Sequence, residues 1–112
     1  MRLKIIREDE SIVHLGLQGR LDVKGVTDIQ YEFLQRTTWV PKRTIVDLSE
    51  VSYVASFGIS MLVSAARELE RKGGKLVLSN PNPLVRKTIE TSGLHGIVPL
   101  VAGETAAMEL LR

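Results

Sequence analysis

Near the start of the chain residues 3–7 are mainly apolar, and apolar and polar side chains alternate in residues 12–18. In the second segment three apolar side chains fall on one face, and His14 falls on the other, polar face. A period of two residues is typical of a half-buried β-strand. The pattern therefore predicts two strands, and the sequence Gly-Arg-Leu-Asp at residues 19–22 predicts a turn after the second.

Apolar residues recur at helical spacing in two longer segments. The first covers about residues 23–37, and Asp22 is suited to be its N-cap because its side chain accepts hydrogen bonds from backbone amides. The second begins after Ser56 and ends at the glycine pair 73–74, where the chain needs a left-handed conformation. We expect this helix to turn five residues toward the core, namely Ile59, Leu62, Val63, Ala66 and Leu69.

Shorter elements complete the pattern. Three apolar runs are typical of buried strands, namely residues 44–48, 75–79 and 97–101. A third helix is predicted from the Asn-Pro-Asn-Pro sequence at 80–83 to Gly93, and a fourth over about residues 104–111. This order predicts an α/β fold with a mixed, mainly parallel sheet of about five strands, four helices and an antiparallel N-terminal edge strand.

Composition adds several exclusions. With 112 residues and no linker, the chain is expected to form one domain over residues 1–112. Aromatic residues make up 4% of the chain, so the core must be aliphatic, and a net charge of +2 without a basic stripe does not indicate nucleic acid. The absence of cysteine excludes disulfides and thiolate metal sites. No apolar run is long enough for a membrane helix or a signal peptide, so the expected location is the cytoplasm.

The longest motif spans residues 47–62 and reads D-L-S-E-V-S-Y-V-A-S-F-G-I-S-M-L. Together with Gly-Arg-Leu-Asp at 19–22, Pro-Leu-Val-Arg-Lys at 83–87 and Thr-Ser-Gly-Leu at 91–94, it resembles the STAS family, which includes the bacterial anti-sigma factor antagonists. The resemblance covers essentially the whole chain. It implies the STAS fold and a protein-binding function without a cofactor.

The motif departs from the family pattern where the family is regulated. Typical members read D-S-S-G there, and an ATP-using anti-sigma factor kinase phosphorylates the second serine. In this chain Ala55 replaces the aspartate, Ser56 keeps the first serine, and Phe57 stands at the phosphoacceptor position. Phosphate adds nearly two negative charges and breaks such complexes by repulsion and desolvation. Because phenylalanine has no hydroxyl, that chemistry is absent at position 57.

Two residues of this motif have alternative interpretations. Ser56 is either a substitute phosphoacceptor or the N-cap of the second helix, and the strong preference of serine for that position favours the cap. Phe57 is either an exposed anchor for a partner or partly buried, and both remain open. The helix face opposite the predicted core carries Phe, Met and small serines, which is typical of a contact surface. The predicted partner-binding residues are Asp22, Ser52, Ala55, Ser56, Phe57, Gly58, Ser60, Met61 and Ser64.

Other polar residues are better explained by structure. Asp22 and Asp47 resemble a carboxylate pair but are expected to serve as a helix cap and a turn residue, and Ser49 and Ser52 are also expected in turns. His14 and His95 have no partners at metal-ligand spacing. Trp39, beside Pro41, is expected to form a packing lid, and Arg86-Lys87 a solvated helix face. No catalytic motif is present, so we expect no enzyme and no metal.

Two functions therefore remain. The leading hypothesis is a non-enzymatic module that binds an anti-sigma factor or switch-type serine kinase through the start of the second helix and the loops around Asp22 and residues 52–56. The alternative is a scaffold or sensor subunit that self-associates, for example as a homodimer through Phe57 and Met61, or binds a small ligand such as a nucleotide. Neither interpretation involves nucleic acid or a membrane.

Overall fold

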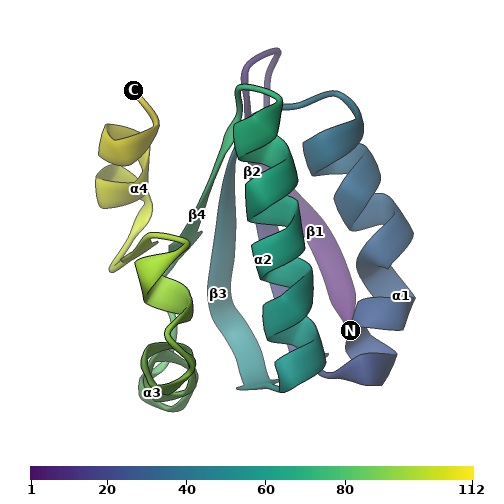
Figure 1. Ribbon diagram of the computed structural model, residues 1–112, viewed down its shortest axis with the longest axis vertical. Coiled ribbons are helices and arrows are strands. Elements are labelled where there is room, and N and C mark those ends of the chain that lie inside the picture. The colour runs from purple at the N-terminus through teal and green to yellow at the C-terminus, as the bar shows by residue number, and fades with distance from the viewer.

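A computed structural model describes residues 1–112 and shows one five-stranded sheet with helices on both faces (Figure 1). The strands are β1 (Arg2–Glu8), β2 (Ile12–Leu21), β3 (Arg43–Val54), β4 (Lys75–Ser79) and β5 (Leu100–Val101). The helices are α1 (Val23–Leu34), α2 (Ser56–Arg71), α3 (Pro83–Ser92) and α4 (Glu104–Leu111). The strands lie in the order β1-β2-β3-β4-β5, with β1 antiparallel to β2 and the other pairs parallel. The predicted fold class is confirmed.

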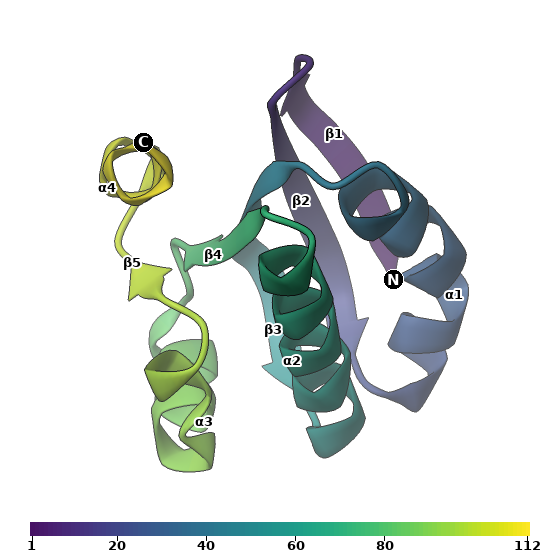
Figure 2. The same ribbon diagram turned by 45° about the horizontal axis from the view of Figure 1, so that its top comes forward.

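The helices divide unequally between the two faces of the sheet. Helices α1, α2 and α3 cover one face and enclose the main core, in which Phe33 is the only aromatic side chain. Helix α4 covers part of the other face, and Figure 2 shows it on the opposite side of the sheet from α1 and α2. A small second cluster holds it there, formed by Ile45, Val77, Ala107 and Leu111. The expected aliphatic core is confirmed.

His14 lies beneath α4 and is buried, which contradicts the prediction that it belongs to a polar face. Its relative exposure is 4%, and its Nδ1 atom lies 3.7 Å from a carboxylate oxygen of Glu104 at the start of α4. The alternation of residues 12–18 correctly predicted which side chains share a face. It did not predict that a distant C-terminal helix covers the second face.

Strand β3 continues well beyond the predicted residues 44–48. Its pairing with β2 shifts between Gly16↔Asp47 and Gln18↔Glu50, so β3 carries one extra residue there, and a second shift follows before Tyr53. Such β-bulges let turn-forming residues remain inside a strand. As a result Ser49 and Ser52 lie in β3 and not in turns, and β2 also continues through the predicted turn to Leu21.

Most helix ends follow the sequence signals. The Asp22 side chain caps α1 by accepting a hydrogen bond from the Gly25 amide at 2.9 Å, and Asn82 caps α3 in the same way through the Val85 amide at 2.8 Å. Gly93 ends α3 with φ of 80°, in the left-handed region that favours glycine. These local signals act within one turn of the chain, which is why the sequence revealed them.

Two segments differ from the prediction. Helix α1 ends at Leu34 and continues as a π-helical turn, Gln35–Trp39, which leaves Trp39 52% exposed with its ring edge-on to Tyr31 at 5.0 Å between centroids. Trp39 is therefore not a packing lid. Within the predicted strand 97–101, only Leu100–Val101 pairs with β4.

Candidate functional site

The first turns of α1 and α2 lie side by side because the strands that precede them end together. Leu21 pairs with Val54 at the ends of β2 and β3, and the Ala55 amide donates to the Leu21 carbonyl at 3.0 Å. The carboxyl ends of parallel strands are the usual place for binding sites in α/β proteins. This edge brings together the predicted residues Asp22 and Ser56, which are far apart in the sequence.

Gly58 is buried and holds α2 against the end of β2. A Cβ atom at this position would lie 2.5 Å from the Leu21 carbonyl oxygen and 2.6 Å from Leu21 Cγ. Only glycine permits that approach without movement of the backbone. Gly58 was predicted to contact a partner, but its burial removes it from the surface and gives it a packing role.

Ser56 is the first residue of α2 and is not its N-cap. The cap position belongs to Ala55, whose methyl group accepts no hydrogen bond. The preference of serine for N-caps led to the wrong prediction, because the cap is decided by where the backbone turns helical, one residue earlier. The Ser56 side chain is exposed at the start of the helix.

The outer side of α2 differs from the predicted contact surface at one residue. Ser60 and Ser64 are exposed as predicted, but Met61 has an exposure of 7% and packs in the core. Helix α1 lies close enough to α2 to cover Met61, which helical periodicity alone could not show. Phe57 is 49% exposed, so it is partly buried and still presents half of its surface to solvent.

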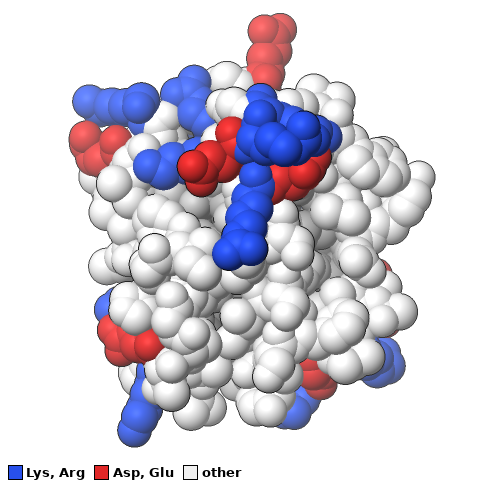
Figure 3. Space-filling model, viewed as in Figure 1, with Lys and Arg blue, Asp and Glu red and all other residues white.

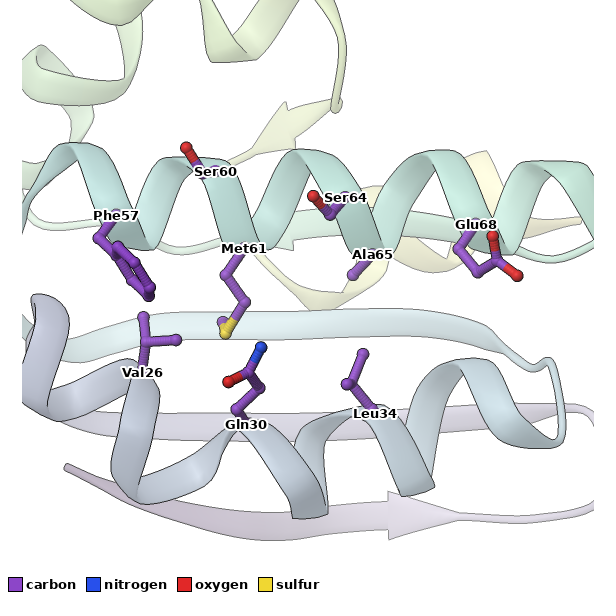
Figure 4. A pocket seen from close by; sticks show the side chains of 9 residues that line it. All are labelled: Val26, Gln30, Leu34, Phe57, Ser60, Met61, Ser64, Ala65 and Glu68. Atoms are coloured by element: carbon purple, nitrogen blue, oxygen red, sulfur yellow. The ribbon is translucent and has the colours of Figure 1, made fainter.

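A groove of about 420 Å³ runs between α1 and α2. Met61 and Ala65 lie along its α2 side below the serines, while α1 contributes the opposite wall (Figure 4). In Figure 4 the Phe57 ring points toward Val26 at one end of the groove, and Glu68 lies at the other end. The lining residues are Val26, Gln30, Leu34, Phe57, Ser60, Met61, Ser64, Ala65 and Glu68. We call this the α1 groove.

A second groove, of about 500 Å³, lies on the other side of α2 against α3. Five of its side chains carry hydroxyl groups and one, Lys87, carries a positive charge. The lining residues are Tyr53, Val54, Ala55, Ser56, Ile59, Leu84, Lys87, Thr88, Thr91 and Ser92. We call this the α3 groove. Tyr53 and Leu84 were not predicted, although Leu84 lies outside the helical spacing of the buried residues Val85 and Ile89, which is itself a signal.

Asp22 and Asp47 do not form a catalytic pair. Asp47 accepts a hydrogen bond from the Ser49 amide at 2.7 Å, so it is bound to local backbone as expected. The Gly25 amide and the nearby Arg20 guanidinium hold the pKa of Asp22 below its usual value. The same guanidinium lies 4.2 Å from the centre of the Tyr53 ring. Arg20 thus joins the start of α1 to the end of β3.

Charged side chains leave most of this face free. Figure 3 shows Lys, Arg, Asp and Glu gathered near the end of the face where α2 finishes, whereas the central part of the face is largely uncharged. Along α2 the first charged residue is Arg67, more than two turns beyond Phe57. No group of three His, Asp or Glu side chains is placed to hold a metal ion. Apolar and hydroxyl-bearing side chains therefore dominate the two grooves of this face.

The α/β fold that carries this surface is shared with a known class of protein. Residues 4–107 match the STAS domain family, and the chain therefore belongs to the STAS domain family. The family resemblance drawn from the sequence is confirmed. No helix is both long and apolar enough to cross a membrane.

The chain is similar to anti-sigma factor antagonists over nearly its whole length. It is 29% identical to the anti-sigma F factor antagonist of Lysinibacillus sphaericus, with 99% of this chain and 93% of the relative covered. The solved structure of the anti-sigma factor antagonist SpoIIAA in its unphosphorylated form superposes with a TM-score of 0.80 at 27% identity, covering 99% and 96% of the two chains. The phosphorylated form of the Bacillus SpoIIAA gives a TM-score of 0.67 at 27% identity, covering 99% and 100%.

Proposed function

We propose that the protein is a non-enzymatic anti-sigma factor antagonist that binds an anti-sigma factor or switch-type serine kinase through the start of α2. The observation that carries the proposal is Phe57, half exposed at the mouth of α2 and at the end of the α1 groove. Aromatic side chains in such positions are typical anchors of protein interfaces. Its relatives are named for the antagonism of anti-sigma factors.

The surface around Phe57 supports this function. Three further apolar side chains are exposed nearby at the starts of helices and the end of β3, namely Val23, Tyr53 and Leu84. Solvent-exposed apolar groups gain free energy when a partner covers them. Asp22 and Ser52 lie at the same edge of the sheet, where β2 and β3 end.

Position 57 distinguishes this protein from an antagonist that is switched by phosphate at the mouth of α2. SpoIIAA exists in unphosphorylated and phosphorylated forms. Phe57 offers no oxygen for phosphoryl transfer, and its ring adds apolar contact area. We therefore expect binding that ATP does not switch off through position 57.

The test uses purified anti-sigma factors from the source organism, each titrated with this protein by calorimetry in the presence of ADP and then of ATP. We expect one to bind with affinities that differ by less than about twofold between the nucleotides. Mass spectrometry after incubation with ATP should find no phosphate on the chain. A phosphate on Ser56 with loss of the complex would disprove constitutive binding, and no complex with any of them would disprove the function.

A second candidate function is favoured by the α3 groove. Its hydroxyl groups and the Lys87 ammonium suit a small polar or anionic ligand such as a nucleotide better than an apolar one. With such a ligand the protein would serve as a sensor subunit of a signalling assembly. Thermal-shift measurements with nucleotides test it, and Lys87→Ala should abolish any stabilisation that they produce.

A further inference from the structure

The α1 groove has a shape and a charge distribution that specify its occupant. We propose that it receives an amphipathic helix of the partner, whose apolar side chains cover Met61 and Ala65 and whose acidic side chains meet Arg67 and Arg71. The proposal rests on the proposed function, because it names the element of the anti-sigma factor that binds beside Phe57.

Small side chains on α2 create the groove. Ser60 and Ser64 stand where α2 faces outward beside α1, and they are too short to fill the space between the two helices. The separation of packed helices depends on the side chains at their contact. Below the serines lie Met61 and Ala65, so a side chain that enters from solvent meets an apolar surface.

The length of the groove matches a helix. Phe57 and Glu68 mark its ends and are eleven positions apart on α2, which corresponds to about 16 Å at 1.5 Å per residue. That distance presents three successive turns of a partner helix, as in helix-in-groove recognition with anchors on one face. An extended peptide would find no strand edge here, because helices form both walls.

The charged residues at one end of the groove set the direction in which the partner helix binds. Glu68 is the only charged residue that lines the groove, and its carboxylate already pairs with Arg71 at 2.6 Å and Lys72 at 3.4 Å. Arg67 is exposed beside them and forms no ion pair. Three cationic side chains on the last turns of α2, Arg67, Arg71 and Lys72, therefore lie near the one carboxylate that lines this end of the groove, while the rest of the lining is uncharged. A helix that is apolar along its length and acidic at this end is complementary to both parts.

The test uses two stapled helical peptides that carry the same three leucines at successive turns. One ends in glutamates and the other in lysines, and each is titrated into the protein by fluorescence anisotropy. We expect the acidic peptide to bind at least about tenfold more tightly at low salt, with a smaller difference at high salt. Reversing the charge of both Arg67 and Arg71 to glutamate should invert the preference.

Two tryptophan substitutions, one in each groove, show which groove the peptide occupies. Ser64→Trp fills the α1 groove and should weaken the acidic peptide by more than about tenfold, whereas Thr91→Trp, at an exposed residue of the α3 groove, should leave its affinity unchanged. Equal binding of the two peptides, no binding of either, or an unchanged affinity in Ser64→Trp would overturn the proposal. A dimer in light scattering that Ser64→Trp converts to a monomer would assign the groove to a second copy and would also overturn it.

The outcome is separable from that of the proposed function. If the anti-sigma factor binds Ser64→Trp as tightly as the unsubstituted protein, the function stands and the groove is not its docking site. If no anti-sigma factor binds the unsubstituted protein, the function fails, whatever the peptides do.

Discussion

Two neighbouring residues of the chain, Ser56 and Phe57, face two different grooves. Ser56 lines the hydroxyl-rich α3 groove, and Phe57 lines the largely apolar α1 groove on the other side of α2. Successive residues of a helix are about 100° apart, so a step of one residue moves a side chain from one groove to the other. The same α2 mouth therefore presents two chemically different surfaces.

This difference bears on the missing phosphoacceptor. A phosphate on Ser56 would enter the α3 groove beside Lys87, where its charge is favourable, and would lie away from the apolar α1 groove. A phosphate on Ser56 is thus expected to act differently from a phosphate at position 57. The two grooves are therefore expected to be regulated separately.

The largest loss of stability is expected at Gly58, whose close contact with Leu21 positions α2 and therefore both grooves. Gly58→Val should destabilise the protein by about 4 kcal/mol or more, because the added side chain collides with the Leu21 backbone and displaces the start of α2. Urea denaturation measures this change. Gly96→Val is the control, since a Cβ there has no neighbour within 4 Å, and its free energy of unfolding should change by less than about 0.5 kcal/mol. Equal losses in the two variants would show that the close approach of α2 to β2 is unimportant.

The next largest change in stability distinguishes the side of α2 that faces the α1 groove from the side that faces the α3 groove. Met61→Ala removes the floor of the α1 groove and should cost about 3 kcal/mol, because the side chain is buried and leaves a cavity. Ile59→Ala, on the side of the α3 groove, should cost only about 1 kcal/mol, since Ile59 is half-buried. Both values follow from denaturant unfolding. A larger loss of stability in Ile59→Ala than in Met61→Ala would show that α2 packs more tightly on the side of the α3 groove.

A binding measurement compares the two grooves directly. Phe57→Asp should weaken the complex with the anti-sigma factor at least about tenfold, or about 1.4 kcal/mol, because it removes an apolar anchor and adds a charge. Ser56→Asp adds the same charge one residue earlier and should weaken the complex less than about threefold. Calorimetry with circular dichroism as a folding check measures both. Similar losses in the two variants would mean that the partner covers both grooves.

The smallest expected effect is on the stability of α1, which Asp22 caps and which forms one wall of the α1 groove. Because the pKa of Asp22 is lowered in the fold, its charge contributes stability at neutral pH that is lost as the pH falls below 3.8 toward the folded value. Asp22→Asn keeps an N-cap but removes this charge. We expect the Tm of the unsubstituted protein to fall further between pH 7 and pH 3 than that of Asp22→Asn, by a few degrees in calorimetry. Parallel curves would show that the Asp22 charge does not stabilise α1.

The sequence predicted features that depend on local signals. The cap at Asp22, the left-handed ends at Gly73 and Gly93, and the range of α4 all follow from interactions within a turn or two of the chain. Strand β4 was predicted to its exact residues because it is a short apolar run between breakers. The family signature added the expected place of the site, at the start of α2.

Features that depend on distant contacts were missed. β3 extends through its Asp-Leu-Ser segment because β2 offers a partner as far as Leu21 and bulges absorb the extra residues. Met61 is buried because α1 packs beside it, and the α3 groove was not predicted because it needs α3 to lie against the end of β3. None of these neighbours is close in the sequence.

By itself the sequence determined the STAS fold, the N-cap of α1 and the absence of a hydroxyl at position 57, because each is set by residue identity and short-range spacing. Only the tertiary structure decided which residues of α2 are exposed. The packing of α1 and α3 on either side of that helix buries Met61, leaves Phe57 half exposed, and places Ser56 and Phe57 on different grooves. A binding surface is formed by several elements at once, and its composition is therefore fixed only when they pack together.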